Sequence, residues 1–539
     1  MPIRPLAPEK TFADAPTAPI AVAPRALARR VSSPSGVTRV ALLSAIIIGS
    51  MAFAVRSIGL SRSFELWVDE MLYAELGRSV SRGEFPTLPD GPFFLHPPGF
   101  FLVEGAVIKI FGISGDSMSV VYDLRWLSAA LGAISVALAF LLVRRVAGTR
   151  IAWFSAIVLV FEPFVLRNNS RVFLETMAGA AVLAGLLILV SYLGREQRKP
   201  AWAPLLVAGL FLGYGWLTKD VFAIYAMVPV VLATFWRHTL RPREAAIVLG
   251  GVVTPYAAYL IVLASKGRLS DWWYAKTSGL QRILGAVQST GFNAPNGPSL
   301  TSRLLAQVGE YGTSYVLLLA CPVAGALACR SRRPERRLIG LTAVAMGVFG
   351  VYIALFGTFE EQYGYGIMIA SVTALTICAA EVCERRHALA WTVVWVGSAF
   401  LVLTVALGTR VELTRDNGFQ QFRAWVVTNL PANAHVGVTD STAEWAFQND
   451  PRFGAWPTAR SLEEHDAHYI LTQSLPASQG YDYESRQMLD WLTRHATPVF
   501  HDAGPTNGNT VLWFIDQPTL KLAAQLNVGS PLPETDGRG

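Results

Sequence analysis

Two adjacent carboxylates follow the first long apolar segment of the chain. Asp69 and Glu70 occur in the run ELWVDEMLYAELGR, close to Trp67 and Tyr73. Acidic side chains at a membrane surface are costly to desolvate unless they are used. One of them can accept a proton from an attacking hydroxyl while the other holds a metal ion or orients the first. The same pair is also explained as solvated acids that favour the N-terminus of a helix.

A basic and an acidic residue four positions apart stand at the start of another apolar segment. Arg171 and Glu175 lie in NNSRVFLETMAGAAVLAGLLIL. On a helix, i,i+4 spacing places both side chains on one face, where the arginine can hold the carboxylate or meet a phosphate. An interfacial ion pair of snorkelling side chains would give the same pattern.

Two more residues with useful chemistry stand at the edges of apolar segments. His96 precedes Pro97 and Pro98, and its imidazole can bind a metal or contact a substrate, although a loop histidine before two prolines is often only structural. Lys219 ends an apolar segment, where a buried ammonium suits a phosphate. The neighbouring Asp220 offers the alternative of a local ion pair.

A short polar run, FEEQYGYG, separates two late apolar segments and contains Glu360, Glu361, Gln362 and Tyr363. It can contact a head group, or it can be a polar loop tip. The sequence contains no GxGxxG, P-loop, HExxH or GxSxG motif, which disfavours nucleotide-binding and hydrolase functions.

The composition indicates that membrane helices position these residues. The chain has 539 residues, of which 52% are apolar and 15% charged, whereas a soluble protein carries about 25% charged residues. The last ~130 residues have an ordinary composition, which predicts a membrane part followed by a soluble part. Segments long enough, or nearly long enough, to span a bilayer are 38–57, 124–145, 150–167, 173–193, 201–218, 220–236, 244–264, 311–329, 337–357, 364–382 and 388–408.

The basic clusters decide how a further apolar stretch, residues 98–113, is interpreted. If this stretch lies on the membrane surface and the N-terminus is cytoplasmic, every basic cluster between closely spaced helices falls inside, as the positive-inside rule requires. If it spans, all of them move outside. It is therefore predicted to be an interfacial helix. The clusters are those at 144–150, 195–199, 237–243, 330–337 and 385–386.

The resulting fold class is mainly α, a polytopic membrane protein of about eleven transmembrane helices with interfacial helices in the first outer loop. Residues 1–37 are predicted to be a disordered cytoplasmic tail, 38–408 a transmembrane catalytic domain and 409–539 an extracytoplasmic α/β domain. In the last of these, strands are expected at 435–438, 469–472 and 511–515, with helices at 419–430 and 483–496. Because the basic clusters lie at helix ends, they act as topology signals, and nucleic acid is not an expected partner.

Taken in order, these segments resemble the GT-C membrane glycosyltransferases, above all the bacterial branch related to protein O-mannosyltransferases and the lipid A aminoarabinose transferase. The resemblance covers roughly residues 38–385. The elements that carry it are the DE pair with YAE, the run HPPGFFLV, the helix LRWLSAALGAISVALAFLLVRRVAG, the spacing from Arg171 to Glu175, and the run LTK that ends at Lys219.

The resemblance implies roles for particular residues. The catalytic base of the family corresponds to Asp69, and its second outer acid corresponds to Glu175. Lys219 occupies the position that meets the donor phosphate. The remaining substrate-binding residues that we expect are Glu70, Tyr73, His96, Arg171, Gln362 and Tyr363.

The chain departs from the family pattern at two places. Many relatives have an acidic residue or a lysine just before the two prolines, where this chain has His96, so acceptor or metal contacts differ. The usual Arg-Tyr of the late outer loop is here Gln362–Tyr363, which removes one cation for the phosphate.

The implied reaction is an inverting displacement at the extracytoplasmic face of a bacterial inner membrane, in a multi-pass protein. A polyprenyl-phosphate sugar is the donor, a lipid, glycan or protein hydroxyl is the acceptor, and the bilayer is a further partner. Phosphate is already a good leaving group, so one carboxylate suffices, unlike in glycoside hydrolysis. No cofactor is required; a divalent metal is compatible with the residues, with Asp69, His96 and Glu175 as candidate ligands.

Other functions for such a chain are a transporter or flippase, an O-antigen ligase-like or polymerase-like enzyme, and a non-catalytic cell-envelope assembly or sensor protein. Transporters usually show inverted repeats and discontinuous helices at the membrane midplane. In this sequence repeats are absent, and the charges gather at the outer interface. The pattern therefore favours the transferase.

Overall fold

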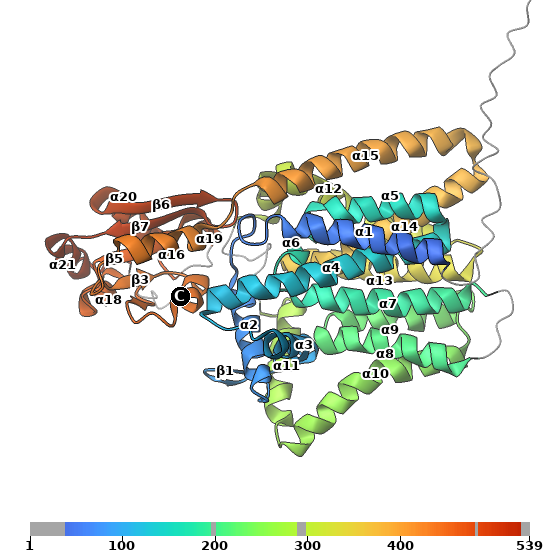
Figure 1. Ribbon diagram of the computed structural model, residues 1–539, viewed down its shortest axis with the longest axis horizontal. Helices are drawn as coiled ribbons and strands as arrows, with labels where there is room; N and C mark the ends of the chain where they lie inside the picture. Colours follow the sequence, from blue (N-terminus) through green and yellow to red (C-terminus); the bar gives the residue numbers. More distant parts are fainter. Residues whose placement is uncertain (1–37, 196–200, 288–297, 480–482, 530–539) are drawn as a thin grey trace, which may run out of the picture.

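The computed structural model describes residues 38–195, 201–287, 298–479 and 483–529. The tail predicted over residues 1–37 lies outside these ranges. Figure 1 shows a long bundle of helices, with a smaller region of strands and short helices at one end. The predicted class, mainly α with a small α/β region at the C-terminal end, is confirmed.

Each predicted apolar segment contains a helix. These helices are α1 (Arg39–Ser57), α4 (Ser117–Ala147), α5 (Thr149–Phe161), α7 (Leu174–Leu193), α8 (Trp202–Thr218), α9 (Phe222–Phe235), α10 (Pro242–Ser265), α12 (Leu300–Ala328), α13 (Pro334–Leu355), α14 (Gly364–Arg385) and α15 (His387–Leu413).

Among the described residues, eight helices are long and apolar enough to cross a membrane, and α5 with its bent continuation α6 (Pro163–Asn169) brings the number to nine. The helices α8 and α9 are apolar but have only 17 and 14 residues, whereas about 20 are needed to span a bilayer. The protein is a multi-pass membrane protein, while the number of about eleven spans stays a prediction.

Small residues let α8 and α10 pack closely. A side chain on Gly209 would collide with the carbonyl oxygen of Val248, and one on Gly213 with that of Val252. Residues four apart lie on one helix face, so both glycines face α10. This close contact holds the end of α8, and with it Lys219, at the end of the bundle.

Three helices lie at the end of the bundle rather than along it: α2 (Val68–Ser81), α3 (Gly99–Phe111) and α11 (Leu269–Ile283). With 13 residues, α3 is not among the candidate spans, and Figure 1 shows it running across the bundle. Its first residue, Gly99, packs on the backbone of Leu217, and the Tyr214 hydroxyl donates to the Gly99 carbonyl oxygen over 2.9 Å. This position agrees with the surface helix predicted at 98–113.

A mixed five-stranded sheet forms the centre of the C-terminal region, in the order β4-β3-β5-β7-β6. Its middle strands β3 and β5 are parallel to each other, and β7 is antiparallel to both β5 and β6. The strands are β3 (Val436–Val438), β4 (Phe453–Gly454), β5 (Tyr469–Gln473), β6 (Thr497–Gly504) and β7 (Gly508–Phe514).

The remaining elements are short. A two-stranded hairpin in the first outer loop pairs β1 (Thr87–Leu88) with β2 (Gly91–Pro92), and a 3-10 turn, η2 (Glu361–Tyr363), precedes α14. The helices around the C-terminal sheet are α16 (Gly418–Asn429), α17 (Ser441–Phe447), α18 (Ala459–Glu464), α19 (Ser474–Gln479), α20 (Arg486–His495) and α21 (Gln517–Gln525).

The strands predicted at 435–438, 469–472 and 511–515 are confirmed as β3, β5 and β7, and the helices predicted at 419–430 and 483–496 are confirmed as α16 and α20. The edge strands β4 and β6 were not predicted. Strand β6 contains Pro498 and has largely exposed side chains, as is usual for an edge strand. It therefore lacks the alternation that marks a half-buried strand.

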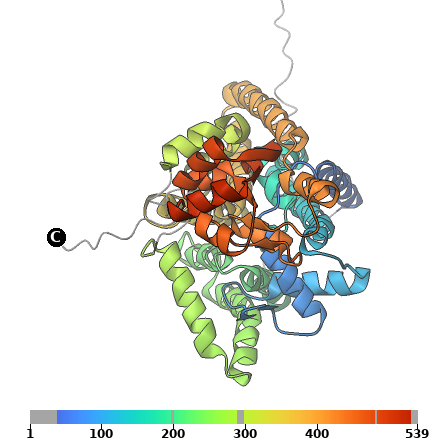
Figure 2. The ribbon, with the colours of Figure 1, turned by 90° about the vertical axis from the view of Figure 1, so that its left-hand side faces the viewer.

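One apolar core joins the outer end of the bundle to the C-terminal sheet. It includes Met71 of α2, Phe100 of α3, Phe422 of α16 and Leu471 of β5, all of them inaccessible to solvent. Figure 2, viewed from that end, shows the C-terminal elements stacked over the bundle. The C-terminal sheet is therefore fixed to the first outer loop. The predicted boundary at residues 408/409 stays a prediction, and α15 itself runs to Leu413.

A buried ion pair anchors the first outer loop to the bundle. Arg125 of α4 contacts both carboxylate oxygens of Glu70, at 2.7 Å and 2.9 Å, and both side chains are fully buried. The same guanidinium donates to the carbonyl oxygens of Leu60 at 2.6 Å and Phe64 at 2.7 Å. Glu70 also accepts a hydrogen bond from the backbone of Val172 over 2.9 Å. Three chain segments thus meet at one pair.

Replacing Arg125 should destabilise the fold. In Arg125→Ala, Glu70 would remain as an uncompensated buried carboxylate, which costs about 3–5 kcal/mol. We expect a clearly lower thermal unfolding midpoint for the detergent-purified protein and less folded protein in membranes. The matched control is Arg82→Ala, which removes an ion pair with Glu84 whose side chains are about half exposed and should leave the midpoint unchanged. Equal midpoints for Arg125→Ala and the unaltered protein would contradict the assignment.

Candidate active site

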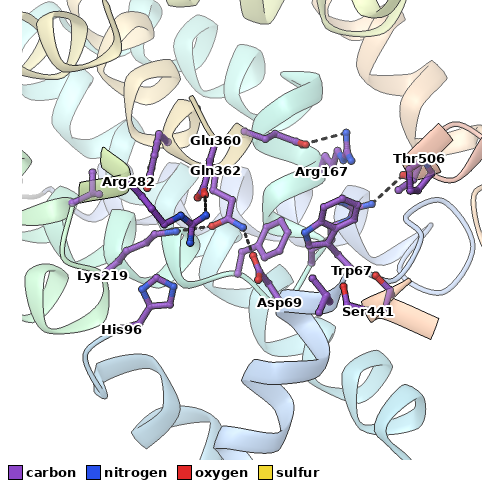
Figure 3. A pocket seen from close by; sticks show the side chains of 18 of the residues that line it. Trp67, Asp69, His96, Arg167, Lys219, Arg282, Glu360, Gln362, Ser441 and Thr506 are labelled. Carbon is purple, nitrogen blue, oxygen red and sulfur yellow. Dashed lines mark hydrogen bonds and ion pairs between the residues drawn. The ribbon is translucent and has the colours of Figure 1, made fainter. Parts of the chain in front are cut away.

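A cavity of about 1280 Å³ lies between the end of the bundle and the C-terminal sheet. Its walls come from α2, α8, α10, α11, α12, the turn η2 and three loops of the C-terminal region. Figure 3 shows its central part, with side chains from these elements pointing toward one another. Of the residues predicted for the site, six line it: Asp69, His96, Arg171, Lys219, Gln362 and Tyr363.

Asp69 lies in the first turn of α2 and is partly buried in the cavity wall. Desolvation, followed by repulsion from Glu360, raises the pKa of Asp69 to about 6, although the hydrogen bond from Gln362 opposes the shift. Gln362 Nε2 donates to Asp69 Oδ2 over 2.5 Å. A carboxylate with a pKa close to neutrality is suited to general-base work.

The two neighbours predicted to bind substrate, Glu70 and Tyr73, do not line the cavity. Glu70 is held by Arg125, as described above. Tyr73 is 2% exposed, and its ring packs against His96 at a centroid distance of 5.9 Å and against Phe101 at 5.7 Å. Both residues support the wall that carries Asp69 and His96.

Lys219, directly after α8, is nearly buried and joins two acidic elements. Its ammonium contacts Glu175 Oε1 and donates to Gln362 Oε1 over 2.6 Å. Gln362 also donates to Asp69. A continuous line of hydrogen bonds therefore connects Glu175, Lys219, Gln362 and Asp69.

Two local pairings considered from the sequence are wrong. Helix α7 begins at Leu174, so Arg171 precedes it and the i,i+4 geometry with Glu175 does not arise. Glu175 instead meets Lys219, 44 positions along the chain. Asp220 is not the ion-pair partner of Lys219 either, because its carboxylate faces α11.

Sequence reasoning missed two cations, Lys276 and Arg282, both on α11. Lys276 Nζ donates to Asp220 Oδ2 over 2.5 Å and to the Leu95 carbonyl oxygen over 2.9 Å, and Arg282 Nη2 donates to Glu360 Oε1 over 2.5 Å. With Lys219 they form what we call the cationic cluster. The signal was present, because both lie in a predicted outer loop and run against the positive-inside trend.

His96 lies beside this cluster. Burial, together with the charges of Lys219, Lys276 and Arg282, holds the pKa of His96 well below its usual value. Its imidazole is therefore neutral at physiological pH and can both donate and accept a hydrogen bond.

Two arginines mark the other part of the cavity. Arg167 Nη1 lies 3.2 Å from both Glu361 Oε1 and the Tyr311 hydroxyl. Arg171 Nη2 donates to the Thr506 hydroxyl over 3.3 Å. In Figure 3, Asp69 lies between Lys219 and His96 on one side and Ser441 and Thr506 on the other.

The residues proposed from the sequence as metal ligands do not form a ligand set. Across the described ranges, no group of three or more His, Cys, Asp or Glu side chains is placed to hold a metal ion. Of the three candidates, Asp69 is bonded to Gln362 and Glu175 to Lys219. These contacts leave no set of free ligands of the kind that a divalent metal needs.

A family model for dolichyl-phosphate-mannose-protein mannosyltransferases matches residues 107–275, which is less than half of the chain. No curated protein matches the sequence. The family match begins in α3 and ends in α11, and so includes Arg171, Glu175 and Lys219.

Solved structures of similar architecture cover most of the chain. ArnT from Cupriavidus metallidurans bound to undecaprenyl phosphate has a TM-score of 0.52 and 14% identity, covering 89% of this chain and 98% of ArnT. Its apo form gives 0.51 and 15%, covering 88% and 98%. The Archaeoglobus fulgidus oligosaccharyltransferase in complex with Zn and sulfate gives 0.52 and 13%, covering 87% of this chain and 72% of that one. The resemblance to GT-C membrane glycosyltransferases is thus confirmed in the fold.

Proposed function

We propose that this protein transfers a sugar from a polyprenyl-phosphate-linked donor to an acceptor hydroxyl, with Asp69 as the base. The observation that carries the proposal is a carboxylate with a pKa of about 6 in the wall of a large cavity that also holds the cationic cluster. The family match to mannosyltransferases and the shared fold with ArnT support it. The reaction takes place at the extracytoplasmic face of a bacterial inner membrane, with the N-terminus in the cytoplasm.

The cationic cluster is the binding site for the donor phosphate. Each of its cations now faces a carboxylate: Lys219 faces Glu175, Lys276 faces Asp220 and Arg282 faces Glu360. A phosphate that enters shares these cations through charge-assisted hydrogen bonds. Nearby apolar lining from α9, α10 and α11 suits the polyprenyl chain; it consists of Ile224, Leu260, Trp272, Leu280 and Ile283.

The reaction proceeds as a single displacement at the anomeric carbon. Asp69 takes the proton of the acceptor hydroxyl, and the oxygen forms a bond to that carbon as its bond to the phosphate oxygen breaks. The configuration inverts, and the polyprenyl phosphate leaves with the bonding electrons, stabilised by the cationic cluster. Because phosphate leaves readily, no general acid is needed. Gln362 orients the Asp69 carboxylate.

Glu175, which the family pattern pairs with catalysis, is a positioning residue in this proposal. It holds the Lys219 ammonium at the phosphate position. No step is assigned to a metal, since Asp69, His96 and Glu175 do not fit a ligand set.

Replacing the base should abolish transfer. In Asp69→Asn the side chain keeps its size but cannot accept the proton, and we expect transfer to fall by about 10²- to 10⁴-fold. The measurement is sugar transfer from a polyprenyl-phosphate sugar in membranes, together with the envelope glycan, at equal expression. Asp90→Asn, an exposed position in the same outer loop, is the control. Normal glycan at normal expression of Asp69→Asn would refute the assignment of the base.

The rate should depend on pH through Asp69. The base works only when ionised, and its pKa is raised to about 6. The kcat/KM should therefore be constant above pH 7 and fall about tenfold per unit well below pH 6. Because repulsion from Glu360 contributes to the shift, Glu360→Gln should move the midpoint to lower pH. A profile without a midpoint near 6, or a midpoint that rises in Glu360→Gln, would contradict this role.

Lys219 should determine donor affinity. We expect Lys219→Met to weaken binding of undecaprenyl phosphate to the detergent-purified protein by about 10- to 100-fold, the effect of losing a hydrogen bond to a charged group. The double variant Lys219→Met/Glu175→Gln avoids a buried unpaired carboxylate and should show the same loss. Lys109→Met, at an exposed lysine of α3, is the control. Unchanged affinity in the folded double variant would exclude Lys219 from the phosphate site.

A further inference from the structure

The C-terminal region closes the part of the cavity that faces away from the cationic cluster. Asp440 and Ser441, Thr506 and Asn507 line it from two separate loops of that region. In Figure 3, Ser441 and Thr506 lie across Asp69 from Lys219. The acceptor has to approach the anomeric carbon opposite the leaving phosphate, which is the direction these loops occupy.

Two hydrogen-bond donors in this wall lack a partner among the described residues. They are Arg171 Nε and Asn507 Nδ2, and their residues are only 1% and 4% exposed. A buried donor without a partner costs about 1–3 kcal/mol, and such groups are rare in folded proteins. Because both residues line a cavity, a ligand with hydrogen-bond acceptors would satisfy them.

The charges in this part of the cavity are balanced or acidic. Arg167 is paired with Glu361, and the Thr506 hydroxyl bridges Arg171 and Asp416, donating to Asp416 Oδ2 over 2.6 Å.

Asp440 adds a further carboxylate to this wall. Two guanidinium groups therefore face three carboxylates. Another phosphate or carboxylate would be repelled here, in contrast to the cationic cluster. The ligand that fits is uncharged.

The side chains also offer both kinds of hydrogen bond beside an aromatic ring. Asp440 and Asp416 accept, Asn507 and Arg171 donate, and the Ser441 hydroxyl does both. Trp67, directly before α2, lines the same cavity. Its ring is a flat apolar surface with a polar edge. A sugar, with hydroxyls that both donate and accept and with an apolar ring face, matches this set.

We infer that Trp67, Arg171, Asp440, Ser441, Thr506 and Asn507 form an acceptor subsite that takes an uncharged, polyhydroxylated group, that is, a saccharide. The inference rests on the proposed function, which puts the base Asp69 between this subsite and the donor phosphate. The C-terminal region is then part of the substrate site, and the acceptor is a glycan or a glycolipid that presents a neutral sugar.

Binding of small probes tests the subsite. The full-length protein is purified in a detergent without a sugar head group, and a panel of methyl hexosides and methyl pentosides is titrated by saturation-transfer NMR, with glycerol 3-phosphate as the anionic counterpart. At least one glycoside should bind, and Asn507→Ala should weaken it about 3- to 10-fold, as expected for one lost hydrogen bond. Ser441→Ala should act in the same direction.

The control is Asn509→Ala, an exposed residue near the start of β7 that does not line the cavity, and it should bind like the unaltered protein. Three results would overturn the inference: no glycoside binds, glycoside binding is insensitive to Asn507→Ala and Ser441→Ala, or glycerol 3-phosphate binds better than every glycoside and loses affinity in Asn507→Ala.

The Asp69→Asn variant separates failure of this inference from failure of the proposed function. We expect it to bind glycosides normally while transfer is lost. If transfer survives in Asp69→Asn but glycoside binding still depends on Asn507, the proposed base fails and the saccharide site stands. If transfer is lost in Asp69→Asn and glycoside binding ignores Asn507, the proposed function stands and the subsite fails.

Discussion

The buried ion pair between Arg125 and Glu70 is the constraint on which the outer end of this protein depends. Burying two charges is costly, and the cost is met only because the guanidinium also saturates carbonyl groups of the loop after α1 and because Glu70 also accepts from the backbone of Val172. The pair therefore tolerates only one arrangement of α1, α2, α4 and the start of α7. Asp69 is the next residue in the chain, so the orientation of the proposed base follows from that arrangement.

The cavity beyond this pair is divided by charge. On one side Lys219, Lys276 and Arg282 surround a neutral His96; on the other, two arginines are balanced by carboxylates and hydroxyls. The hydrogen bonds from Glu175 through Lys219 and Gln362 to Asp69 cross from the first part to the centre. An anion that binds Lys219 would compete with Gln362, and thereby alter the hydrogen bond on Asp69. Donor binding and the state of the base are thus physically linked.

Much of the fold was predictable because it follows from local rules. Long apolar segments must become helices in a bilayer, where no water satisfies the backbone, and the basic clusters at their ends set one consistent orientation for the prediction. The inner strands β3, β5 and β7 are buried and apolar, so their sequences indicated them. The exposed edge strand β6, with Pro498, carries no such pattern. The short helices α8 and α9 met the prediction in place but not in length.

The sequence by itself determined the class of protein, the position of almost every helix, and the presence of Asp69, His96, Glu175 and Lys219 at the ends of apolar segments. Only the tertiary structure decided the partners. Lys219 pairs with Glu175 rather than Asp220, Glu70 serves the fold rather than the cavity, and Lys276, Arg282 and Asn507 join the site from distant segments. The reason is physical: hydropathy and periodicity act over neighbouring residues, whereas an ion pair or a cavity wall depends on which helices pack side by side.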